Sequence, residues 1–336
     1  MALCRVYLLT YRRNHLLPRA LNSLLNQTFT DWICELHNDD PSDPFPRELV
    51  EKIADPRIVI VDHVENLGPT RTFNLVYQPK SEVFISLLED DNWWEPHFLA
   101  TMINAMEQFP NVQVAWANMR LWQEESDGSW TDIGKNIWNS CQTDGVQLFD
   151  WGQQQQIMGA IHSNGAMILR SQFASNFVIP DDTPFASVEL VRERAFHFPI
   201  LFVPQVCANF AITQSTSRSK NRSVWSRIQI LMTASFFKHV PVEVETIRQI
   251  WLEAGSTTAK STSSLFFAAL ICPDCRQLLK YARLKDWIFF IASCLKRPKI
   301  ALENLQATNS YPDVWNFLDR QTAIRVQEMK KQVYSD

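Results

Sequence analysis

The chain has 336 residues, of which 46% are hydrophobic and 20% charged, the composition of an ordinary globular protein. Its net charge of −4 argues against general affinity for nucleic acid. The seven cysteines are odd in number and scattered, which predicts reduced thiols and a cytoplasmic protein. No segment has the length that a membrane span needs, and the N-terminus is not typical of a signal peptide.

The first ninety residues alternate between short apolar runs and segments with helical spacing. Apolar runs bounded by turn residues predict buried strands, and leucines three and four apart predict an amphipathic helix. Such alternation is typical of a parallel sheet with right-handed crossovers. We expect strands at 4–11, 31–36, 57–61 and 83–88, and helices at 16–26, at 47–54 and in the segment that ends near 78.

The fourth of these strands ends on acids. Glu89, Asp90 and Asp91 follow the apolar run directly, and Trp93 and Trp94 come next. Neighbouring carboxylates repel each other, and carboxylate oxygens are the natural ligands of hard divalent cations. Ligands of open α/β sheets bind at the carboxyl ends of strands, where this cluster falls. We therefore predict a metal site, and the alternative is a turn that caps the next helix.

The second half of the chain changes character near residue 220. Alternating residues predict a strand at 112–122 with a returning strand at 129–138, and an apolar run predicts a further strand at 198–202. From about 224 onward the spacing is helical. We expect amphipathic helices over 225–240, 242–255 and 265–302, and a last helix at about 314–329.

Four short motifs follow the predicted strands in a fixed order. Their residues are Thr10 and Arg13; Asp39, Asp40, Pro41 and Ser42; Asn66, Gly68, Arg71 and Asn74; and Glu89, Asp90, Asp91, Trp93, Trp94 and Pro96. This order resembles the family 2 glycosyltransferases, and the resemblance covers about residues 3–215. It implies the GT-A fold, which is an α/β nucleotide-diphospho-sugar transferase fold with a Rossmann-like, mainly parallel sheet.

The resemblance also implies a domain organisation and an activity. Residues 1–220 would form the GT-A domain, with a nucleotide-sugar-binding half at 1–110 and an acceptor-binding half at 111–220, and 221–336 a helical extension. The activity would be inverting hexosyl transfer from a nucleotide-diphosphate sugar, most simply a UDP-sugar, to a glycan or lipid-linked acceptor in polysaccharide biosynthesis. The alternatives are a non-catalytic GT-A-like binding protein and a nucleotidyltransferase, but no glycine-rich phosphate loop supports the latter.

Roles for single residues follow from the same resemblance. Asp39 would bind the base edge, Thr10 and Arg13 would line the base or diphosphate pocket, and Asp90 would lie near the ribose. Asp91 would hold Mn²⁺ or Mg²⁺ against the diphosphate. The remaining expected donor contacts are Asp40, Asn66, Gly68, Arg71, Asn74, Glu89, Trp93, Trp94 and Arg218. Turn chemistry is the alternative for the Asp39–Asp40 pair, and a solvated helix position is the alternative for Arg71.

The catalytic base is where the sequence departs most from the family pattern. An inverting transferase needs a carboxylate that takes a proton from the acceptor hydroxyl. The position that carries this acid in the family is Ser187, which cannot serve as a carboxylate base. Glu189 is the nearest acid and our first candidate, and Asp181 and Asp182 are the alternatives.

The helical extension combines aromatics with Lys and Arg between 265 and 300. This combination suits a helix that lies on an anionic membrane, which predicts a weak peripheral contact with its inner face. The alternative, which we favour, is that the helices pack on one another or on the first domain, or mediate self-association. Periodicity alone does not separate these cases.

Overall fold

The structure is a computed structural model that describes the chain except residues 1, 139–144, 151–162, 215–221, 258 and 334–336. The chain divides into two compact units. The first lies within Met1–Trp151, His162–Val178 and Phe196–Ser217, and the second within Gly152–Ile161, Ile179–Ala195 and Arg218–Asp336. The predicted change near 220 is close to this division. The segment Ile179–Ala195, which we expected in the first domain, groups with the second unit.

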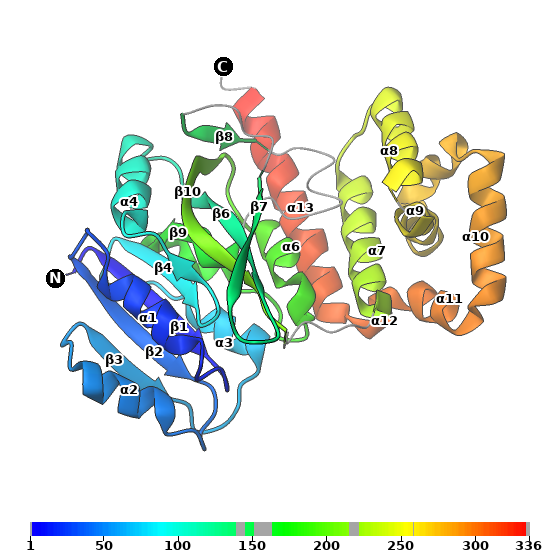
Figure 1. Cartoon of the computed structure of the whole chain (residues 1–336). Helices are drawn as coiled ribbons and strands as arrows, with labels where there is room; N and C mark the ends of the chain where they lie inside the picture. The colour runs from blue at the N-terminus through cyan, green and yellow to red at the C-terminus, as the bar shows by residue number, and fades with distance from the viewer. Residues whose placement is uncertain (1, 139–144, 151–162, 215–221, 258, 334–336) are drawn as a thin grey trace. The chain divides into compact units, whose positions relative to one another are not determined.

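The first unit begins with the predicted alternation of strands and helices. Its first four strands are parallel and lie in the order β3-β2-β1-β4 (Figure 1). The short helices between them begin with proline in their first turn, where its missing N–H costs nothing. The elements are β1 Cys4–Thr10, α1 Leu17–Leu25, β2 Trp32–Asn38, α2 Phe45–Ile53, β3 Ile58–Asp62, α3 Pro69–Leu75 and β4 Phe84–Glu89.

The strand register brings the expected motifs to one edge. Thr10 is the partner of Asn38, and Asn38 is the partner of Asp62. On the other side of β1, Glu89 is the partner of the residue before Thr10. The carboxyl ends of four parallel strands therefore meet at one edge, which is where an α/β sheet binds its ligands.

Beyond β4 the sheet becomes mixed. Strand β9 is antiparallel to both β4 and β6, whereas β6 and β10 are parallel to each other. Strands β5, β7 and β8 pair antiparallel with β10, β6 and β10, and the β6–β7 pair confirms the predicted hairpin. The elements are β5 Trp93–Trp94, β6 Val114–Glu124, β7 Trp130–Asn136, β8 Gln147–Phe149, β9 Met167–Arg170 and β10 Ile200–Ile212.

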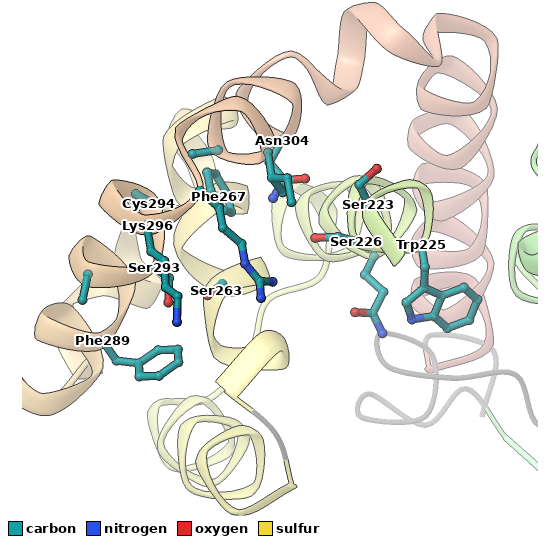
Figure 2. Close-up of a pocket in the computed structure, with 15 residues that line it drawn as sticks. Ser223, Trp225, Ser226, Ser263, Phe267, Phe289, Ser293, Cys294, Lys296 and Asn304 are labelled. Carbon is teal, nitrogen blue, oxygen red and sulfur yellow. The ribbon is translucent and has the colours of Figure 1, made fainter. Parts of the chain in front are cut away.

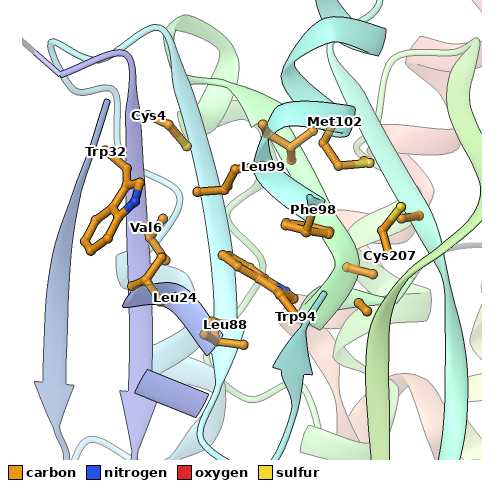
Figure 3. Close-up of a cluster of buried hydrophobic side chains, with 14 of the residues drawn as sticks. Cys4, Val6, Leu24, Trp32, Leu88, Trp94, Phe98, Leu99, Met102 and Cys207 are labelled. Atoms are coloured by element: carbon orange, nitrogen blue, oxygen red, sulfur yellow. The ribbon is translucent and has the colours of Figure 1, made fainter. Parts of the chain in front are cut away.

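Packing in the core of the first unit supports the carboxyl edge of the sheet. Helix α1 buries Leu17, Leu21 and Leu24, which recur at helical spacing. Trp94 stacks on Phe98, the first residue of α4 Phe98–Gln108, with ring centroids 4.2 Å apart (Figure 3). Because Trp94 follows the acid cluster by three residues, this stack holds the cluster against the core.

The second unit is helical, as predicted. No helix in the described part of the chain is long and apolar enough to cross a membrane. The long C-terminal helix α13 confirms the predicted last helix. The helices are α6 Val188–Glu193, α7 Arg222–His239, α8 Val244–Thr257, α9 Ala259–Ile271, α10 Leu284–Lys296, α11 Pro298–Leu305, α12 Ala307–Ser310 and α13 Pro312–Val333.

Candidate functional site

The loop after β1 and the acids after β4 form one charged cluster. The Thr10 hydroxyl donates to Asp90 Oδ2 at 2.9 Å, and the Tyr11 amide donates to the same atom at 3.2 Å. Arg13 Nη1 lies 3.3 Å from Asp90 Oδ1 and also forms an ion pair with Asp91. One guanidinium therefore holds two neighbouring carboxylates together, which offsets their mutual repulsion.

Glu89 is held away from these two acids. Its Oε2 accepts a 2.6 Å hydrogen bond from Asn92 Nδ2, and Asn92 Oδ1 accepts one from the Ala211 amide at 2.9 Å. A Cβ at Gly165 would lie 2.8 Å from Asn92 Nδ2 and 2.9 Å from Glu89 Oε2, so a side chain there has no room. Gly165 is therefore favoured at this position because any larger residue would clash with Asn92 and Glu89.

The two remaining acids suit a divalent cation that is shared with a substrate. The described residues contain no group of three His, Cys, Asp or Glu side chains placed to hold a metal ion. Mg²⁺ sites commonly take one or two carboxylates, with substrate phosphates and water completing the shell. Asp91, whose side chain is 16% exposed, and its neighbour Asp90 supply hard oxygen ligands that fit such a site.

Burial and, second to it, the adjacent charge of Asp91 raise the pKa of Asp90 to about 7, against the opposing effects of Arg13 and Thr10. A carboxyl whose pKa is raised in the folded state stabilises the fold at low pH. That contribution is lost as the pH rises through the folded pKa. Ionisation of Asp90 therefore lowers the unfolding free energy of the metal-free protein.

We expect Asp90→Asn to remove this pH dependence. From about pH 5 to about pH 8, the metal-free wild-type protein should lose roughly 2 kcal/mol of unfolding free energy that the variant keeps. Urea denaturation of both proteins at the two pH values, with EDTA present, measures the difference. Parallel pH profiles would show that Asp90 is already ionised in acid.

Asp39, which is buried, is the centre of a second network. Its Oδ1 accepts from the Leu67 amide and from His63 Nδ1, both at 2.8 Å, and its Oδ2 accepts from the Gly68 amide and from Asn66 Nδ2, both at 3.1 Å. A carboxylate has about four acceptor positions, so these bonds use them all. In the structure, Asp39 binds the segment that precedes α3 through these hydrogen bonds. The expected contact between Asp39 and the edge of a nucleotide base stays a prediction.

We expect Asp39→Ala to destabilise the protein by roughly 3 kcal/mol, because the amides of the half-buried Leu67 and Gly68, together with His63, lose a buried acceptor. Urea denaturation would measure it. Asp62→Ala is a suitable control, since this acid ends the neighbouring strand but is 32% exposed and pairs with Arg47. Equal losses in the two variants would contradict the structural role of Asp39.

Asp40 has local partners. Arg12 Nε lies 2.6 Å from its Oδ2, and the Ser42 hydroxyl and amide donate to its Oδ1 at 2.7 and 3.1 Å. These contacts lower the pKa of Asp40 to about 2. Pro41 lies in the turn closed by the Asp43 amide and the Asp40 carbonyl, a position that suits proline. This turn accommodates Pro41 within the second motif.

The two tryptophans after the acids differ in position. Trp94 is 2% exposed, and its Nε1 donates to the Gly165 carbonyl at 2.8 Å. It is a core residue, so the prediction that it binds substrate is wrong. Trp93 lies on the opposite side of β5, because successive side chains of a strand point to opposite faces.

Trp93 makes a cation–π contact with Arg19, which was not predicted from the sequence. The Arg19 guanidinium lies 3.8 Å from the centroid of the Trp93 ring and 3.9 Å from that of Trp130, and it donates to the Asp91 carbonyl at 2.8 Å. Burial lowers the pKa of Arg19 to about 10. This sandwich fixes the backbone of the acid cluster from α1. Arg19 is on the polar side of its helix, and no local pattern pointed to its two aromatic neighbours.

The other predicted residues fall outside this cluster. Arg71 is exposed on α3 and lies 3.8 Å from Glu65, and Asn74 lies on the same helix. Glu189 is half-buried on α6, and Asp181 and Asp182 precede that helix on the surface of the second unit. Arg218 lies outside the described residues.

Comparisons with known proteins agree with the motifs and the fold. Residues 6–170, just under half of the chain, match the model of Glycosyl transferase family 2. WcaA of Escherichia coli (strain K12), whose name assigns it to colanic acid biosynthesis as a glycosyl transferase, is 26% identical over 124 residues. That alignment covers 37% of this chain and 44% of WcaA, so the chain matches less than half the length of this relative.

Solved structures of S. aureus TarS share the fold. TarS 1–349 in complex with UDP aligns with a TM-score of 0.57 at 13% identity, over 99% of this chain and 92% of that one. A longer TarS structure aligns with a TM-score of 0.56 at 12% identity, over 95% of this chain and 55% of that one. At such low identity the likeness establishes the fold alone.

The chain therefore has the fold of the GT-A glycosyltransferases. Residues 6–170 match the model of Glycosyl transferase family 2, in agreement with the resemblance seen in the sequence.

Proposed function

We propose that the chain transfers a sugar, with inversion, from a UDP-sugar to a hydroxyl of a glycan or lipid-linked acceptor. The observation that supports this most is the meeting of Thr10, Asp39 and Asp90 at the carboxyl edge of the parallel strands. S. aureus TarS, which has the same fold, has been solved in complex with UDP and with UDP-GlcNAc, and this supports a uridine nucleotide as donor.

A divalent cation belongs to this proposal. Asp91, with Asp90 beside it, would hold Mn²⁺ or Mg²⁺ together with the donor diphosphate, and the ion would neutralise charge on the leaving nucleotide. Arg13 keeps both acids side by side before the ion binds. Arg19 fixes the backbone carbonyl of Asp91, so the carboxylate starts from a defined position.

Glu189 is our proposed base, with Asp181 and Asp182 as alternatives. Burial and the nearby Asp313 raise the pKa of Asp182, which makes it a stronger base once ionised. Ser187, at the position of the family acid, is 1% exposed, and its hydroxyl donates to the Pro184 carbonyl at 2.8 Å. This engaged serine favours the second candidate function, a GT-A-like protein that binds a nucleotide sugar or a glycan without transferring it.

Thermal unfolding in the presence of UDP-sugars, with and without Mn²⁺, tests the donor proposal, because a ligand that binds only the folded state raises its apparent stability. We expect a UDP-sugar to raise the melting temperature only when Mn²⁺ is present. Release of UDP upon addition of acceptor glycans then separates transfer from binding. If no UDP-sugar shifts the melting temperature under either condition, the proposed donor class is wrong.

We further propose a cytoplasmic location. The cysteines of the described residues are all free: Cys4, Cys34, Cys207, Cys272, Cys275 and Cys294. Five of these thiols are buried, where reduced cysteine behaves as a small apolar side chain. Free thiols are what the reducing cytoplasm maintains.

A further inference from the structure

The second unit contains a cavity of about 670 Å³ between helices α7, α9, α10 and α11 (Figure 2). Its walls are mainly apolar and include Trp225, Phe267 and Phe289 from three different helices. This size and lining are typical of sites for small organic ligands. None of the described donor or base residues lines it, so the cavity is not part of the proposed donor site.

One polar group in the wall lacks a partner. Asn304 of α11 is 4% exposed, and its Oδ1 accepts no hydrogen bond from any described residue. A buried polar atom without a partner destabilises the protein. The oxygen and nitrogen of an amide can exchange places by rotation, so Asn304 can offer a ligand either an acceptor or a donor. It therefore points to a ligand that carries a polar group.

Two cations stand at the same cavity. Lys296 ends α10, and Arg297 precedes the first residue of α11; both line the cavity and are exposed. Neither forms an ion pair with an acid of the described residues. The start of α11 has no side-chain cap, so its positive helix end adds to their field. The polar part of the ligand should therefore be an anion.

The outer face of α10 is apolar and exposed. Leu284, Ile288, Ile291 and Leu295 recur at spacings of four, three and four, so they form one stripe along the helix. Their exposed fractions run from 52 to 77%. On the buried side, Phe290 stacks on Phe266 with ring centroids 4.5 Å apart. Packing between helices thus buries Phe290 and leaves the stripe exposed.

The stripe borders the cavity. On α10 the lining residues Phe289, Ala292 and Lys296 each follow a stripe residue directly in the sequence. Successive residues of a helix differ by about 100° in direction, so the two rows are neighbours on its surface. An apolar chain that lies along the stripe therefore has a route into an apolar cavity whose mouth carries two cations.

We propose that this cavity binds a lipid phosphate, with the hydrocarbon chain between α7, α9 and α10 and the phosphate on Lys296 and Arg297. Such a ligand matches the apolar walls, the two unpaired cations and the unpartnered amide of Asn304. A phospholipid of a bilayer and a single-chain lipid phosphate that carries an acceptor share this chemistry. The stripe on α10 would lie against the apolar layer that supplies the lipid.

The purified full-length protein and farnesyl monophosphate, a single-chain lipid phosphate, test this by titration calorimetry. We expect one saturable site, with binding about ten-fold or more weaker for farnesol, which lacks the charge-assisted contacts, and none for inorganic phosphate. Co-sedimentation with phosphatidylcholine vesicles, with and without phosphatidylglycerol, distinguishes the source. Binding to both probes indicates that bilayer lipid enters the cavity, and binding to farnesyl monophosphate alone indicates a single-chain carrier.

Two variants place the site. Ala292→Trp fills the cavity from an exposed helix position, and Lys296→Glu with Arg297→Glu reverses the charge at its mouth; each should weaken binding of farnesyl monophosphate about ten-fold or more. Lys280→Glu with Lys285→Glu is the matched control, because both lysines are exposed in the same unit and do not line the cavity. Circular dichroism checks that each variant is folded.

The same measurements can overturn the proposal. Equal losses in the lining and control charge variants would mean general electrostatic attraction rather than a site. Unchanged binding in a folded Ala292→Trp variant would place the lipid elsewhere. If the protein binds neither probe and sedimentation velocity shows a dimer that Ile288→Lys dissociates, a second copy of the chain covers the stripe and the cavity is not a lipid site.

Discussion

Asp91→Asn is expected to abolish Mn²⁺-dependent binding of UDP while it leaves the fold intact. Asp91 is the more exposed of the two acids that Arg13 holds together, so its oxygens are the ones available to an incoming cation. Asn keeps the size of the side chain but lacks the charge that a divalent ion needs. Asp90 alone does not compensate, because Thr10 and Tyr11 already donate to one of its oxygens.

The measurement is thermal or urea unfolding with UDP and Mn²⁺, where ligand at one hundred times its dissociation constant adds about 2.7 kcal/mol to wild-type stability. We expect UDP and Mn²⁺ to add almost nothing to the stability of the Asp91→Asn variant. Asp62→Asn is the matched control, because Asp62 ends β3 at the same edge of the sheet but pairs with Arg47. A folded Asp91→Asn protein that still binds UDP only with Mn²⁺ would rule out Asp91 as the metal ligand.

The edge of the sheet could be predicted because it depends on local patterns. Apolar runs followed by turn residues define where strands end, and crossover connections align those ends. Thr10, Asn38 and Glu89 accordingly meet in the structure, and Arg13 contacts Asp90 and Asp91. The family resemblance added the order of the motifs, and it predicted that the aligned ends belong to one site.

The roles of single side chains were harder to predict, since they depend on contacts between distant segments. Asp39 looks like an available carboxylate in the sequence, but the segment 63–68 uses its acceptor positions. Trp93 and Trp94 look alike, and only the pairing of β5 with β10 decides which one faces the core. The role of Arg19 depends on its contact with Trp130, which lies in a hairpin more than a hundred residues further along the chain.

The helical unit shows a different limit. Periodicity predicted that this unit is helical, because its longer segments carry apolar residues at three- and four-residue spacing. It did not predict which apolar face another helix covers. Phe290 and Ile291 are adjacent and equally apolar, yet the first is buried against Phe266 and the second is 52% exposed. That distinction comes from tertiary packing, and it is the origin of the proposed lipid site.

The last prediction concerns the proton acceptor. Glu189→Gln is expected to lower turnover by roughly two to four orders of magnitude, the range that a general base contributes. Donor affinity should stay nearly unchanged, because a base acts in the transition state and not in the binding of the donor. Glu189 is half-buried in the first turn of α6, two residues after the serine at the family's base position.

Parallel variants decide among the three acids. Asp181→Asn and Asp182→Asn remove the alternatives one at a time, and Glu245→Gln is the control, since its side chain is 80% exposed on α8 of the same unit. Initial rates of UDP release give turnover, and the thermal shift with UDP and Mn²⁺ gives donor binding. A collapse of turnover in Asp182→Asn alone would move the base to the residue whose pKa burial and Asp313 raise. If all three variants keep both the rate of UDP release and the donor shift of the wild type, none of these acids is the base. If the wild type binds the donor but releases no UDP with any acceptor, the engaged Ser187 marks a GT-A domain that binds without transferring.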